Sequence, residues 1–99
     1  MVKHLEKEED FYKLIEKGIV LVDFYADWCG PCKMLIPVLN EVDFCDVIKV
    51  NIDEYPNLAQ KFGIMSIPTL AFFKDGLESE RLIGFRGIND LKETYESIQ

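Results

Sequence analysis

The sequence has few cysteines, no long apolar run and no excess of basic residues. Its 3 cysteines are too few and too irregularly spaced for a small disulfide scaffold. The longest apolar stretch, residues 19–26, is too short to cross a bilayer and contains Asp23. With 11 Lys and Arg against 18 Asp and Glu, the formal net charge is −7. We therefore expect neither a membrane protein nor a nucleic-acid-binding protein.

The composition that is present suits one globular domain. A chain of 99 residues, 48% hydrophobic and 12% aromatic, can bury a core without covalent staples. We expect residues 1–99 to form a single domain. The first ten residues contain no apolar segment of the kind that a signal peptide needs, so we expect a cytoplasmic protein. In that reducing compartment, two nearby cysteines are more often catalytic than structural.

The most informative segment is WCGPCK, residues 28–33. It follows a β-rich run and opens a segment that is predicted to be helical. Cys29 then falls at a helix N-terminus, where free backbone N–H groups and the helix dipole stabilise a thiolate. Cys32 lies three residues further on the same face, so the two sulfurs can form a disulfide. This arrangement points to thiol–disulfide exchange; half of a zinc site or two incidental thiols is the alternative.

Hydrophobic spacing and turn residues predict the order of the elements. We expect helices over residues 6–17, 29–44 and 56–63, and a last helix that Asn89 caps and that presents Leu91, Tyr95 and Ile98 on one face. Strands are expected over residues 19–25, 47–52, 69–73 and 79–84, with a weak signal at 2–5. Asp75-Gly76 predicts a hairpin, and Pro37 predicts a kink in the second helix. Helices alternate with strands, and we expect parallel strand pairs in the first part of the chain and an antiparallel pair near its end. This order predicts an α/β sandwich.

The segment VDFYAD followed by WCGPCK resembles the thioredoxin family, and the resemblance covers nearly the whole chain. It implies the thioredoxin fold, a central mixed five-stranded sheet of order 1-3-2-4-5 flanked by about four helices. It also implies a protein-disulfide reductase that serves as an electron carrier in cell redox homeostasis. No cofactor or metal would be bound, because the redox-active group is the Cys29–Cys32 disulfide. The implied partners are an NADPH-linked flavoprotein, thioredoxin reductase, and disulfide-containing proteins. We expect a monomer.

Asp23 is unusual for its position in an apolar strand. A charged, unpaired carboxylate there costs several kcal/mol, so its pKa should rise. The alternative is that Asp23 faces solvent at a strand end. The resemblance places Asp23 beneath the two cysteines and implies that it exchanges a proton with Cys32. Lys49 matches the family lysine near that carboxylate. Without the resemblance, a lysine in the segment IKV, residues 48–50, is predicted to lie at the surface.

SIPT, residues 66–69, matches a second family motif. The resemblance implies a cis peptide bond before Pro68, facing the disulfide, whereas the pattern alone favours an ordinary trans proline at a strand start. The backbone edge at Ile67 would pair with an extended substrate peptide. Gly84 matches a family glycine whose missing side chain leaves room beside the disulfide. The implied substrate-binding surface comprises Trp28, Gly30, Pro31, Ile67, Pro68 and Gly84.

The chain departs from the family pattern at three places. Phe85 stands where many members carry a small residue, and Tyr25 replaces the tryptophan common before the motif. The stretch over residues 37–49 is shorter than usual, so the second helix should end early. None of these departures touches the chemistry of the cysteines, but they bear on substrate choice.

The remaining cysteine and the single histidine have no assigned role. We interpret Cys45, which has no family match, as a half-buried structural thiol rather than a regulatory one. His4 is expected at the surface. A zinc site built from Cys29, Cys32, Cys45 and His4 has unusual spacing and is discounted.

Two other functions stay open from the sequence. One is a disulfide oxidase or isomerase of the same fold, which the missing export signal disfavours. The other is a binding subunit that uses the same surface without redox turnover. The Gly-Pro dipeptide between the cysteines is typical of the reducing class.

Overall fold

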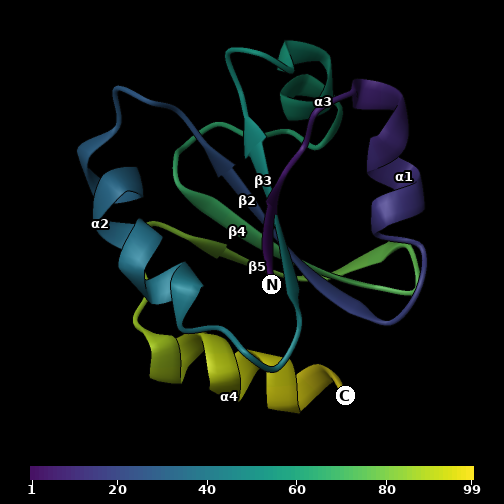
Figure 1. The fold of residues 1–99 in the computed structure, drawn as a ribbon, viewed down its shortest axis with the longest axis vertical. Helices are drawn as coiled ribbons and strands as arrows, with labels where there is room; N and C mark the ends of the chain where they lie inside the picture. Colours follow the sequence, from purple (N-terminus) through teal and green to yellow (C-terminus); the bar gives the residue numbers. More distant parts are fainter.

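The computed structural model describes residues 1–99, and its centre is a five-stranded sheet of order β1-β3-β2-β4-β5 (Figure 1). β1 and β2 both pair with β3 in parallel, while β2–β4 and β4–β5 are antiparallel. This is the predicted mixed sheet and strand order. The strands are β1 (Val2–His4), β2 (Ile19–Tyr25), β3 (Asp46–Asn51), β4 (Thr69–Lys74) and β5 (Leu77–Ile83).

Helices cover both faces of the sheet (Figure 1). They are a short 3-10 turn (Glu8–Asp10), α1 (Phe11–Leu14), α2 (Gly30–Asn40), α3 (Pro56–Lys61) and α4 (Ile88–Ile98). One core cluster joins β2 to Phe11 of α1 and Leu58 of α3. A second cluster joins the opposite face to Leu35 of α2 and Leu91 of α4. None of the helices has the length and apolar character that a membrane span requires.

Three helix predictions need correction. The helix expected over residues 6–17 is reduced to a 3-10 turn and α1, because Gly18 is left-handed with φ 68° and its backbone pairs with Asp75, so the chain leaves helical geometry at Ile15. The second helix ends at Asn40 rather than at residue 44. Asn89 does not cap the last helix: Gly87 is its N-cap, and Asn89 lies within the first turn.

The hairpin signal at Asp75-Gly76 is confirmed. Both residues have positive φ, 50° and 87°, as tight hairpin turns between antiparallel strands require. The Asp75 carboxylate accepts a hydrogen bond of 2.8 Å from the backbone N–H of Gly18, which ties this turn to the start of β2.

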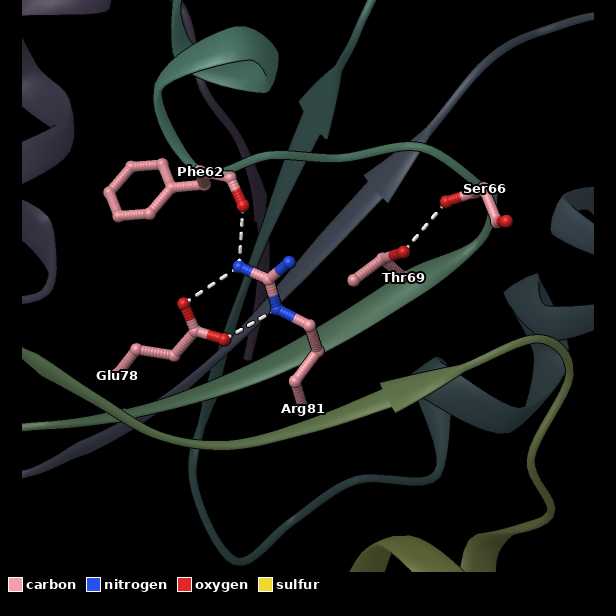
Figure 2. Close-up of polar contacts among 5 residues, drawn as sticks. All are labelled: Phe62, Ser66, Thr69, Glu78 and Arg81. Carbon is pink, nitrogen blue, oxygen red and sulfur yellow. Dashed lines mark hydrogen bonds and ion pairs between the residues drawn. The ribbon is translucent and has the colours of Figure 1, made fainter.

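Arg81 on β5 joins that edge strand to the end of α3 (Figure 2). Its guanidinium donates two hydrogen bonds to the Glu78 carboxylate, at 2.6 and 2.8 Å, and one of 2.6 Å to the carbonyl of Phe62. The bidentate pair fixes the orientation of the guanidinium. The loop that leads from α3 to β4 is therefore anchored to β5 at its start.

Candidate functional site

Cys29 and Cys32 form a disulfide at the N-terminus of α2. Cys29 is the N-cap residue of this helix, and its sulfur accepts a hydrogen bond of 3.2 Å from the backbone N–H of Cys32. Gly30 and Pro31 form the first turn, where proline loses no hydrogen bond because that N–H has no helical partner. A thiolate at Cys29 would be stabilised by the same N–H and by the helix dipole.

The loop that carries Pro68 faces the disulfide. The Ile67–Pro68 peptide bond is cis, as the family motif implied and contrary to the trans alternative. The Ile67 carbonyl oxygen lies 3.8 Å from Cys29 Sγ. Thr69 Oγ1 donates a hydrogen bond of 2.7 Å to the Ser66 carbonyl, which closes the loop on itself (Figure 2).

Asp23 and Lys49 form a buried ion pair across neighbouring strands. They are in register on β2 and β3, and Lys49 Nζ lies 3.7 Å from Asp23 Oδ2. Asp23 is fully buried, so its side chain does not face solvent at a strand end. Lys49 is only 6% exposed, so the prediction that it lies at the surface is wrong. Neither Asp23 oxygen has a hydrogen-bond partner. Burial therefore raises the pKa of Asp23 to about 6, although the charge of Lys49 acts in the opposite direction.

Two residues that the sequence did not single out hold Trp28 in place. Asp53 Oδ2 accepts a hydrogen bond of 2.9 Å from Trp28 Nε1. Asn51, at the end of β3, accepts hydrogen bonds through Oδ1 from the backbone N–H groups of Asp53 and Glu54. The sequence did carry a signal here, because an Asn at a strand end commonly organises the following turn with its side chain.

Apolar side chains are exposed on the segments that flank the disulfide. Trp28 is 69% exposed, Met65 96%, Ile83 56% and Phe85 44%. Phe85 thus reaches solvent. Gly84 has a φ of 89°, and a Cβ built there would meet no atom within 4 Å. The backbone conformation, rather than crowding in the protein itself, therefore explains this glycine.

The structure does not bring His4 or Cys45 to the disulfide to form a zinc site. No group of three or more His, Cys, Asp and Glu side chains is placed to hold a metal. Cys45 is a half-buried free thiol, as expected, and burial raises its pKa to about 11. His4 is exposed, yet its Nδ1 lies 3.2 Å from the hydroxyl of Tyr25.

Comparisons with known proteins agree with this geometry. A family model described as thioredoxin matches residues 1–97. Thioredoxins of Staphylococcus epidermidis and Staphylococcus aureus are 46% and 45% identical to this chain in alignments of 94 positions, which cover 90% of this chain and 90% of each relative.

Solved structures of thioredoxins share the fold. A mutant thioredoxin from Halobacterium salinarum superposes with a TM-score of 0.87 at 36% identity, covering 97% of this chain and 88% of its own. A Malassezia sympodialis thioredoxin has the same TM-score at 31% identity, covering 97% of this chain and 91% of its own. The two cysteines at the start of α2, the cis proline that faces them and these matches over nearly the whole length show that the chain belongs to the thioredoxin family.

Proposed function

We propose that Cys29 and Cys32 carry out the activity of the family, the reduction of disulfides in other proteins. Family membership makes the chain a thioredoxin-type protein-disulfide reductase, with the cysteine pair as its redox-active group. Thioredoxins carry no bound cofactor, so the two electrons of each turnover come from the dithiol itself. The observation that carries the assignment of roles is the position of Cys29 as the N-cap of α2.

The reaction begins at Cys29. Its thiolate attacks one sulfur of the substrate disulfide, the substrate S–S bond breaks, and the second substrate sulfur leaves as a thiolate. A mixed disulfide between Cys29 and the substrate results. The N–H of Cys32, which lies 3.2 Å from Cys29 Sγ, supports the anionic form of the attacking sulfur.

Cys32 completes the reaction. Its thiol gives a proton to Asp23, and the resulting thiolate attacks Cys29 in the mixed disulfide. The Cys29–Cys32 disulfide forms, and the first substrate sulfur leaves as a thiolate that takes up a proton. The substrate has gained two electrons and the protein has lost two. Asp23 suits this role because a carboxyl group with a pKa of about 6 can exchange protons near neutral pH.

Lys49 supports this role of Asp23 by its charge, at 3.7 Å. Substrate binds on the surface formed by Trp28, Gly30, Pro31, Ile67, Pro68 and Gly84. The free backbone edge at Ile67 offers main-chain hydrogen bonds to an extended peptide.

Thioredoxins act with a thioredoxin reductase and with disulfide-containing proteins. For this chain we propose an NADPH-linked flavoprotein reductase as the electron donor. We further propose that the protein works as a single domain over residues 1–99, as a monomer and in the cytoplasm, where a reductase of this kind would keep the cysteines reduced.

Reduction of insulin disulfides tests the function. Wild-type protein should reduce insulin with dithiothreitol or a thioredoxin reductase as donor, and the Cys29→Ser/Cys32→Ser double variant should not. Equal activity of the two proteins would show that the cysteine pair is not the redox centre and would favour a binding subunit. A measured potential near about −270 mV is expected for a reductase, against about −120 mV for a strong oxidant.

A further inference from the structure

Lys49 is a buried cation whose position needs an explanation. Its Nζ lies 3.7 Å from Asp23 Oδ2, beyond the usual 2.7–3.2 Å range of an N–H···O hydrogen bond. The carboxylate alone therefore does not define where the ammonium lies. The second neighbour is the ring of Tyr25, whose centroid is 4.4 Å from Nζ. The face of an aromatic ring attracts a cation at this distance, most strongly where water is excluded.

The ring of Tyr25 is itself held in place. Tyr25 lies two residues after Asp23 on β2, so both side chains point to the same face of the sheet. The Tyr25 hydroxyl is 3.2 Å from His4 Nδ1, and the two rings meet edge to face at 6.1 Å. His4 is the register partner of Lys49 on β1, as Asp23 is on β2. The ammonium thus lies in a row of side chains that crosses three strands.

A cavity of about 400 Å³ connects this row to the resolving cysteine. Tyr25, Lys49 and Cys32 all line it, together with the exposed residues Asp27 and Lys33. The cavity gives the long side chain of Lys49 a route to water that it does not take in this structure.

We propose that Tyr25 is a positioning residue of the reaction: its ring holds the ammonium of Lys49 beside Asp23 and the cavity behind Cys32. This inference rests on the proposed proton exchange between Asp23 and Cys32. It assigns a role to a side chain that stands where tryptophan is common, and that role depends on the charge distribution of the ring rather than on its volume.

Weakening the ring's attraction should raise the pKa of Asp23. A buried ammonium that loses its aromatic neighbour gains by moving through the cavity to water. Asp23 then loses the positive charge that lowers its pKa. The other charged or titratable groups that face this site are His4 from β1, Asp27 from the loop before α2, Lys33 from α2 and Glu54 from the turn after β3.

A pair of variants of equal shape tests the ring directly. One protein carries Tyr25→Phe, and the other carries a trifluorinated phenylalanine at position 25, which keeps the shape but weakens the negative face of the ring. The Asp23 carboxyl group is titrated by NMR in the oxidised proteins, where no cysteine titrates at the site. We expect the fluorinated protein to show an Asp23 pKa higher by about one unit, the low end of the effect of a nearby opposite charge. Equal or lower values would overturn the proposal.

The molecule offers a matched control. Lys61 Nζ lies 4.9 Å from the ring centroid of Tyr12, a second Tyr–Lys pair whose residues belong to α1 and α3 on the other face of the sheet. The same pair of substitutions at position 12 should leave the Asp23 pKa unchanged. An equal shift from position 12 would show a general effect of fluorination and would contradict the proposal.

The pH profile of insulin reduction separates this proposal from the proposed proton exchange. If both hold, the profile of kcat/KM moves to higher pH together with the Asp23 pKa. A raised pKa with an unmoved profile would support the positioning of Lys49 and would instead contradict the exchange between Asp23 and Cys32.

Discussion

The indole of Trp28 is fixed by one hydrogen bond, in which Nε1 donates to Asp53 Oδ2 at 2.9 Å. Trp28 precedes the N-cap cysteine and is 69% exposed, so packing alone does not hold its ring. Asn51 organises an Asx-type turn that brings the carboxylate of Asp53 to the indole of Trp28. An aromatic surface beside Cys29 therefore depends on a residue from the turn after β3.

Asp53→Ala should weaken substrate docking. Loss of the hydrogen bond frees the ring, and we expect kcat/KM for insulin reduction to fall about fivefold, or about 1 kcal/mol, mainly through KM. Asp43→Ala is the matched control, because Asp43 is exposed in the loop before β3 at the other end of that strand. Equal kinetics of the two variants would show that the Trp28–Asp53 contact has no part in docking.

The two cysteines should differ when each is replaced alone. Cys29→Ser should abolish reduction, because the attacking sulfur is lost. Cys32→Ser should instead trap mixed disulfides with substrate proteins, since attack proceeds but resolution does not. Non-reducing gels and mass spectrometry of the trapped species distinguish the outcomes. If Cys29→Ser trapped partners and Cys32→Ser turned over, the roles would be reversed.

Asp23→Asn should change how stability depends on pH. The pKa of Asp23 rises from 3.8 to about 6 on folding, so the folded state binds this proton more tightly than the unfolded state. Its contribution to stability is complete below pH 3.8 and is lost as pH rises through about 6, a loss of about 3 kcal/mol.

The Asp23→Asn protein has no carboxyl group to ionise at this position. Its free energy of unfolding should therefore increase relative to that of wild type between about pH 4 and about pH 8. Urea unfolding of the oxidised proteins at both pH values measures the difference. Asp43→Asn, at an exposed carboxylate, should run parallel to wild type. An Asp23→Asn curve parallel to wild type would mean that Asp23 is not desolvated in solution.

The Asp23→Asn substitution should also slow the attack of Cys32 on the mixed disulfide at neutral pH.

Trp28 should report the redox state by fluorescence. It is the only tryptophan and is adjacent to Cys29, and a nearby disulfide quenches indole emission. We expect brighter emission on reduction with dithiothreitol. Thiol titration confirms that reduction has occurred, and an unchanged spectrum after complete reduction would place the indole away from the sulfurs.

Cys45 should be far less reactive than Cys29 in the reduced protein. Burial raises the pKa of the Cys45 thiol to about 11, so almost none of it is thiolate at neutral pH. Alkylation with iodoacetamide, followed by peptide mass spectrometry, should modify Cys29 at least about 100-fold faster. Cys45→Ala should retain insulin reduction. Comparable alkylation rates would show that Cys45 is exposed in solution.

The local signals of the sequence determined the sheet and the cysteine pair. A nearly continuous apolar run predicts β2, because a central strand is covered on both faces. Asp75-Gly76 predicts the β4–β5 turn, because both positions require positive φ. The spacing of Cys29 and Cys32 predicts their disulfide, because three residues along a helix return to the same face. These features depend on neighbours in the chain and can be predicted from them.

The tertiary structure decided what surrounds the cysteines. Lys49 has the pattern of a surface residue, and only its register beside Asp23 makes it a buried partner. Asp53 and Tyr25 acquire their contacts with Trp28 and Lys49 from strands and turns distant in sequence. The shortened α1 has the same origin, since the backbone of Gly18 pairs with Asp75 in the β4–β5 turn and the helix ends before it. Residue identity sets which groups are available, but long-range packing sets their distances, burial and charge environment.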